Sequence, residues 1–85
     1  MYREVAFENR DTFIQLGLTI SAIRRLKGLS QEELAEKSNI SRSLLSSIEA
    51  PNIIRSFSLE VLFNISRALE MTPGDLLNYS QFLDH

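Results

Sequence analysis

The feature that most constrains this chain is a pair of helix-start signals placed close together, at Ser30 and at Ser41. Ser30 is a good N-cap residue, and Glu33 three positions later completes a reciprocal S-x-x-E capping box. Ser38-Asn39 then interrupts the helical pattern, and Asn tolerates the left-handed conformation that a tight turn requires. The sequence therefore predicts two short helices joined by the turn 38–40.

Helical periodicity continues on both sides of this two-helix unit. Apolar residues three and four positions apart predict a helix over 11–27 that Gly28 closes, and Ser58 caps another over 59–69. Thr72-Pro73 opens a last helix that extends to about Tyr79. The expected inward positions are Phe13, Leu16, Ile20, Ile23, Leu34, Ala35, Leu44, Leu45, Ile48, Leu59, Leu62, Ile65 and Leu69. We predict an all-α fold with an arm over 1–10, a five-helix domain over 11–79 and a C-terminal tail over 80–85.

Composition excludes several function classes. The chain has no Cys, and its only His is the final residue, His85. Thiolate metal sites, His clusters and His-activated nucleophiles are therefore excluded, and we expect no cofactor and no enzymatic activity. The N-terminus lacks the apolar core of a signal peptide, and no apolar run approaches the length of a membrane span. An intracellular, cytoplasmic protein is the simplest expectation.

Charge is unevenly distributed along the chain. The net charge is −2, from nine Lys and Arg against eleven Asp and Glu, which is not the basic footprint typical of a nucleic-acid binder. Residues 20–55 nevertheless hold six basic and four acidic residues, whereas 56–85 hold one basic residue and four acidic ones. The middle of the chain is thus mildly basic, and its C-terminal third is acidic.

The predicted unit over about 30–49 has the requirements of a helix-turn-helix, whose second helix enters the major groove of DNA. A small residue, Ala35, is available where the two helices touch, and Asn39 suits the turn. In the second helix Leu45 and Ile48 face inward. The outward residues are polar, and all but one are short: Arg42, Ser43, Ser46 and Ser47.

Five stretches in order resemble the phage-repressor/Cro-like helix-turn-helix domains, often called the xenobiotic-response-element family. They lie between Leu16 and Leu77, about three quarters of the chain: LGLTISAIR (16–24), KGLSQEELA (27–35), ISRSLLSSIE (40–49), SLEVL (58–62) with ISRAL (65–69), and TPGDLL (72–77). Any one of these stretches is a weak signal, whereas all five in order with ordinary spacing are a strong one.

The resemblance implies a lambda-repressor-like fold that binds double-stranded DNA as a homodimer on a pseudo-palindromic operator. Gln31 would then bond a backbone phosphate, and Arg24 and Glu49 would form an ion pair between the first helix and the end of the third. The base edges would be met by Arg42 and Ser43 at the start of the third helix and by Ser46 and Ser47 one helical turn later. Ser41, the N-cap of that helix, belongs to the same expected DNA-binding set. Arg55 is expected to lie near the DNA backbone.

Each of these residues also has a structural interpretation. Gln31 is also a good helix former within a capping box, and Arg42 also fits the role of a solvated surface charge. The serines are either contacts or small residues that permit close approach. A second apolar stripe on the first helix, Leu18, Ala22 and Leu26, is expected to pack against Val5 and Phe7 of the arm, the alternative being a partner surface.

The sequence thus favours a small transcriptional regulator, with repression as the expected mode and the nucleoid as its place when bound. The alternative is an antitoxin-like or other protein-interaction module on the same fold, since the loop 52–57 is apolar and the C-terminal third acidic. Large apolar groups in that loop and in the C-terminal segment are the candidate dimer surfaces: Ile53, Ile54, Phe57, Leu77, Tyr79, Phe82 and Leu83.

Overall fold

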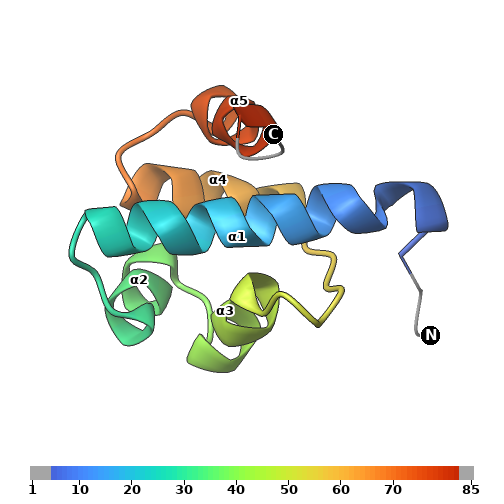
Figure 1. Cartoon of the computed structure of the whole chain (residues 1–85). Helices are drawn as coiled ribbons and strands as arrows, with labels where there is room; N and C mark the ends of the chain where they lie inside the picture. Colours follow the sequence, from blue (N-terminus) through green and yellow to red (C-terminus); the bar gives the residue numbers. More distant parts are fainter. Residues whose placement is uncertain (1–4, 83–85) are drawn as a thin grey trace.

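The computed structural model describes residues 5–82 as a short 3-10 helix followed by five α-helices. The 3-10 helix η1 is Phe7–Asn9, and the α-helices are α1 (Arg10–Leu26), α2 (Gln31–Ser38), α3 (Arg42–Glu49), α4 (Leu59–Ala68) and α5 (Pro73–Phe82). In Figure 1, α2 and α3 lie on one side of the long α1, and α5 lies on the opposite side. The described part contains no strand, and the all-α, five-helix prediction is confirmed.

The capping box at the start of α2 is complete. The Glu33 backbone N–H donates to Ser30 Oγ at 3.0 Å, and the Ser30 N–H donates to Glu33 Oε1 at 2.8 Å. The bond from the Ser30 backbone N–H, with the Ser30 side chain adding to it, holds the pKa of the Glu33 carboxyl below its usual value. Satisfying these free N–H groups fixes where α2 begins.

The other helix starts follow the same local chemistry. Ser41 Oγ accepts from the Leu44 N–H at 3.0 Å, Ser58 Oγ from Val61 at 3.2 Å, and Thr72 Oγ1 from Asp75 at 3.0 Å. Each is a side-chain oxygen bonded to the N–H three residues on, as an N-cap requires. The starts of α3, α4 and α5 are therefore determined by single residues in the sequence.

A single apolar core joins all five helices. Its buried members are Leu16, Ile20, Ile23, Leu34, Ala35, Leu45, Ile48, Leu62, Ile65, Leu69 and Leu76. Helix α1 packs against both α3 and α5, and α4 packs against both α2 and α5. Burying each large aliphatic side chain contributes about 1.5–3 kcal/mol, so this cluster holds α2 and α3 at fixed positions against α1 and α4.

Three expectations differ from the structure. Helix α5 continues to Phe82, past Tyr79, because no stop signal interrupts it. Leu59, expected inward, is 68% exposed, since as the first residue of α4 it lies beyond the packed face. The expected packing of Leu26 on the arm is also wrong: Leu26 is 86% exposed and Phe7 is 73% exposed. Because η1 runs straight into the start of α1, Phe7 lies about 25 Å from Leu26 at the other end of that helix.

Candidate nucleic-acid interface

Helix α3 presents a buried face and an exposed polar face. Leu45, Ile48 and Glu49 are buried against the rest of the molecule. Arg42, Ser43 and Ser46 are exposed on the other face, as is the N-cap Ser41. A short helix held from one side, with polar groups on the other, is the geometry that a recognition helix needs in order to reach base edges.

The turn between α2 and α3 is closed by backbone hydrogen bonds. Asn39 has φ 57° and ψ 41°, which is the left-handed conformation. Its N–H donates to the Glu36 carbonyl at 3.1 Å, and the Ile40 N–H donates to the Ala35 carbonyl at 3.0 Å. These bonds satisfy the last carbonyls of α2 and fix the angle at which α3 leaves the turn.

Sequence reasoning missed the role of Gly17, at the point where α1 crosses the end of α3. A Cβ built on Gly17 would overlap the carbonyl oxygen of Ile48 and lie 3.0 Å from its carbonyl carbon. Glycine inside a helix costs about 1 kcal/mol relative to alanine, so its presence there is a signal of close packing. The missing side chain lets the two helix backbones meet directly.

Arg24 and Glu49 form a buried, two-point ion pair between α1 and the last residue of α3. Arg24 Nε donates to Glu49 Oε2, and Arg24 Nη2 donates to Glu49 Oε1, both at 2.9 Å. Their side chains are 8% and 3% exposed. Arg24 Nη1 also donates to the Leu29 carbonyl at 2.7 Å, so the guanidinium ties α1 to both α3 and the loop before α2.

Gln31, the first residue of α2, joins this ion pair. Its Nε2 donates to Glu49 Oε1 at 2.9 Å, on the same oxygen that accepts from Arg24. The side chain expected at a phosphate is thus half-buried and anchored within the protein. No sequence pattern indicates this contact, because the two residues belong to different helices.

The serine hydroxyls of α3 differ in what they have to offer a ligand. Ser47 is half-buried and donates to the Leu44 carbonyl at 2.8 Å, so its proton is used inside its own helix. Ser41 accepts from the Leu44 N–H, and within residues 5–82 its own hydroxyl proton has no acceptor. Ser43 and Ser46 are exposed. The structure therefore leaves Ser41, Ser43 and Ser46 as the exposed hydroxyls of the set, and Ser47 as the half-buried one.

Two cations extend from this side of the molecule. Arg42 at the start of α3 and Arg55 in the loop between α3 and α4 are both exposed, and within residues 5–82 neither forms an ion pair.

Residues 5–82 hold no group of three or more His, Cys, Asp or Glu residues placed to bind a metal ion. In the same stretch, no helix has both the length and the apolar character to cross a bilayer.

The candidate dimer surfaces lie on two separate parts of the molecule. In the loop, Ile53 and Ile54 are 46% and 37% exposed, but Phe57 packs edge-on against Phe13, with ring centroids 5.6 Å apart. Leu77 and Tyr79 on α5 are 42% and 54% exposed. The Phe82 side chain and the whole of Leu83 lie outside the described residues.

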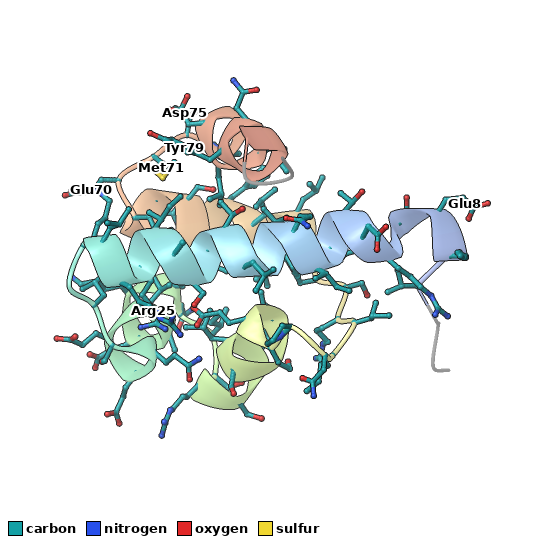
Figure 2. All side chains as sticks on the ribbon, viewed as in Figure 1. Glu8, Arg25, Glu70, Met71, Asp75 and Tyr79 are labelled. Atoms are coloured by element: carbon teal, nitrogen blue, oxygen red, sulfur yellow. The ribbon has the colours of Figure 1, made fainter. Side chains whose placement is uncertain are left out.

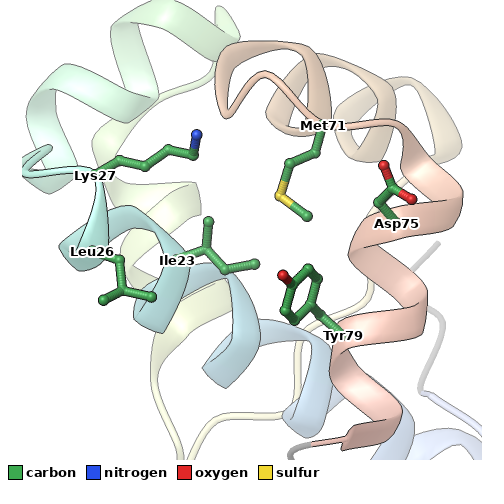
Figure 3. Close-up of a pocket in the computed structure, with 6 residues that line it drawn as sticks. All are labelled: Ile23, Leu26, Lys27, Met71, Asp75 and Tyr79. Carbon is green, nitrogen blue, oxygen red and sulfur yellow. The ribbon is translucent and has the colours of Figure 1, made fainter.

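A pocket of about 500 Å³ opens between the C-terminal end of α1 and α5. Its lining is Ile23, Leu26, Lys27, Met71, Asp75 and Tyr79. Figure 3 shows the Tyr79 hydroxyl pointing into the pocket, with Lys27 and Asp75 on opposite sides of its mouth. Figure 2 places Tyr79, Asp75 and Met71 on the α5 side of the molecule, away from α2 and α3. The pocket is therefore remote from the polar face of α3.

Comparisons with known proteins agree with this geometry. A family model described as helix-turn-helix matches residues 20–76. The HTH-type transcriptional regulator SinR of Bacillus licheniformis is 40% identical over 63 residues, which cover 74% of this chain and 56% of SinR. The chain thus spans about half the length of that curated relative.

Two solved structures are also similar. SinR, the master regulator for biofilm formation, in complex with DNA matches with a TM-score of 0.66 and 39% identity, over 73% of this chain and 97% of that one. The restriction-modification controller protein C.AhdI from Aeromonas hydrophila matches with a TM-score of 0.71 and 32% identity, over 76% of this chain and 96% of that one.

Fold and site together define a small all-α domain built around a helix-turn-helix over α2 and α3. The chain belongs to the phage-repressor/Cro-like helix-turn-helix family, whose similar members here are transcriptional regulators.

Proposed function

We propose that this chain is a sequence-specific DNA-binding transcriptional regulator, acting as a repressor, with α3 in the major groove. The observation that carries the proposal is the arrangement of α3. Its apolar face and its last residue are fixed to α1, while Arg42, Ser43 and Ser46 project from the opposite face. The similarity to SinR, solved in complex with DNA, supports the same conclusion.

Selection of bound sequences from a random DNA library tests this function. A sequence-specific regulator enriches one motif, and unrelated DNA competes poorly for binding to it in a mobility-shift assay. A protein-interaction module on the same fold, such as an antitoxin-like partner, enriches no motif and shows no preference among competitors. That outcome would replace the proposed function with the alternative.

Arg42 is proposed to read a base, whereas Gln31 is proposed to contact the backbone. The exposed guanidinium can pair with both acceptors of a guanine, a contact worth about 1–3 kcal/mol of discrimination. Arg42→Ala should then weaken binding to the selected site far more than binding to random DNA. Gln31→Ala should weaken both by a similar factor. Equal losses for Arg42→Ala would make Arg42 a phosphate contact and move base reading to Ser43 and Ser46.

We propose that the regulator is a homodimer and that the pocket face of α1 and α5 forms its interface. This face lies on the opposite side of α1 from α3, so pairing through it leaves the recognition helix uncovered (Figure 1). It exposes the large side chains of Leu26 and Tyr79, and under a two-fold axis Lys27 of one copy can meet Asp75 of the other. A dimer that reads a pseudo-palindromic operator needs its two recognition helices about 34 Å apart, facing successive major grooves of one duplex.

Sedimentation of two matched variants tests the interface. Leu26 and Ile53 are both exposed, so replacing either by Glu leaves the core intact. Leu26→Glu should give a monomer, and Ile53→Glu should remain a dimer. The reverse result would assign the interface to the loop 52–57. A wild-type protein that is monomeric both free and on its selected DNA would refute dimerisation.

Such a regulator would act in the cytoplasm, on the nucleoid when bound, and needs no cofactor or catalytic step. A protein partner bound to the same apolar face would compete with the second copy of the chain, although it would leave α3 itself uncovered, because the two surfaces are separate.

A further inference from the structure

We propose that the buried Arg24–Glu49 ion pair is a positioning device for Gln31, and that it presents the Gln31 amide to a DNA phosphate. This inference rests on the proposed DNA binding. It assigns the ion pair a part in recognition in addition to its part in holding α1 and α3 together.

The hydrogen bonds define the direction of the Gln31 amide. Glu49 Oε1 accepts from Arg24 Nη2 and from Gln31 Nε2, each at 2.9 Å. The opposite orientation of the amide would place its carbonyl oxygen against a carboxylate, which is repulsive, so the nitrogen must face Glu49. A glutamine amide nitrogen carries two protons, and only one of them is used in this bond.

Glu49 is itself unable to move freely. Its side chain is 3% exposed, and both of its oxygens are held by the planar guanidinium of Arg24. Arg24 is fixed in turn by the Leu29 carbonyl. A rigid acceptor at this position restrains the long, rotatable side chain of Gln31 before any ligand arrives.

The location of Gln31 makes this restraint useful. Gln31 is the first residue of α2, where the capping box takes up the Glu33 N–H but not the N–H groups of Gln31 and Glu32, which point to where an anion would bind. The neighbouring Glu32 and Glu33 are exposed acids, so general charge attraction does not favour a phosphate here. A neutral amide, already oriented, supplies a directed donor without the entropy cost of ordering the side chain on binding.

A double-mutant cycle tests the inference. The first variant, Arg24→Met with Glu49→Leu, removes the acceptor for Gln31 without changing the net charge or leaving a buried charge unpaired. The second is Gln31→Ala, and the third combines all three substitutions. We expect each of the first two to lower the affinity for the selected site and for unrelated DNA alike, by about tenfold, the loss of one hydrogen bond to a charged group. The combination should lose no more than either alone.

Additive losses in the combined variant would show that the ion pair acts independently of Gln31, and they would overturn the inference. So would wild-type affinity in either of the first two variants. All affinities are measured below the unfolding transition of every variant. If the Arg24→Met, Glu49→Leu protein does not fold, Gln31→Asn replaces it. This shorter amide cannot reach Glu49 and a phosphate together, so it should bind as poorly as Gln31→Ala, and wild-type binding would refute the proposal.

A measurement without DNA separates this inference from the proposed function. In NMR spectra of the free protein, the side-chain amide protons of Gln31 should be shifted from random-coil positions, and they should return there when Glu49 is replaced by Leu alongside Arg24→Met. Random-coil shifts in the wild type would refute the anchoring whatever the DNA result. Shifted signals in a protein that binds no DNA would refute the proposed function and the phosphate contact but leave the anchoring standing.

Discussion

Replacing Gly17 by Ala places a methyl group where α1 meets the backbone of α3. The added Cβ would overlap the Ile48 carbonyl oxygen and lie 3.0 Å from the carbonyl carbon and 3.7 Å from Glu49 Cα. All three atoms belong to the backbone, so no side chain can rotate away. The two helices must separate instead, and the buried Leu16, Leu45 and Ile48 then lose part of their contact.

The magnitude follows from two opposing effects. Overpacking costs about 1–3 kcal/mol and more where only the backbone can yield, so we take about 3 kcal/mol for this site. Alanine recovers about 1 kcal/mol of helix propensity relative to glycine. The expected net destabilisation is about 2 kcal/mol. In a domain of this size, that lowers the midpoint of thermal unfolding by roughly 8–16 °C.

Gly74→Ala is the matched control, since Gly74 also lies within a helix. A Cβ there meets only Thr72 Oγ1, at 3.9 Å, which is ordinary contact. Gly74→Ala should leave the unfolding midpoint unchanged or raise it slightly. Thermal unfolding followed by circular dichroism compares the two variants. Equal midpoints for Gly17→Ala and Gly74→Ala would refute the argument that α1 and α3 meet backbone to backbone.

Four further predictions concern stability, pH and salt. Glu49→Ala leaves the buried Arg24 charge without its partner and should lower the free energy of unfolding by about 3 kcal/mol, whereas Arg24→Met with Glu49→Leu should lower it clearly less. An unchanged midpoint of thermal unfolding for Glu49→Ala would mean that the ion pair does not contribute to stability. Ser38→Ala should be neutral or stabilising by about 1 kcal/mol in urea unfolding, because within residues 5–82 the buried Ser38 hydroxyl has no hydrogen-bond partner. A loss of stability larger than about 1 kcal/mol would show that the hydroxyl does have a partner. Because the pKa of Glu33 is lowered, its contribution to the free energy of unfolding is present above its ordinary pKa of about 4.3 and is lost as the pH falls through the folded value. The difference in the free energy of unfolding between wild type and Glu33→Gln should therefore shrink on acidification. A difference that stays constant with pH argues against a charge effect. The log–log salt slope of DNA binding should be shallower than the roughly −10 of lac repressor, because few cations are expected to face the DNA. A slope as steep as that of lac repressor would reveal a further basic surface.

The helix boundaries could be predicted because they depend on local chemistry. Ser30, Ser41 and Ser58 each bond an N–H three residues away, and Asn39 adopts the left-handed turn that its side chain tolerates. Such signals lie within a few residues of sequence and need no tertiary information. The end of α5 was misplaced for the same reason: no residue near Tyr79 stops a helix, and the structure continues it to Phe82.

The missed features all depend on distant parts of the chain. Gly17 is needed because the Ile48 backbone packs against it, and Gln31 is held by a hydrogen bond to Glu49. Both partners are far away in the sequence, so neighbouring residues do not indicate either contact. The DNA-facing residues are predicted from the resemblance and from the outward positions of α3. The structure places Arg42, Ser43 and Ser46 at its surface but directs the Ser47 proton into its own helix. Their contacts with DNA remain predictions.

The charge of the chain explains why rigidity matters at this interface. With a net charge of −2, the protein gains little from long-range attraction to DNA. Affinity must then come from short-range contacts whose entropy cost is already met in the free protein. Gly17 allows α3 to pack closely against α1, and the Arg24–Glu49 ion pair holds the two helices in that position. Gln31 is held in turn by its hydrogen bond to Glu49. A mutation that loosens any of them should therefore weaken DNA binding more than its effect on local contacts alone would suggest, because the lost order must be restored each time the complex forms.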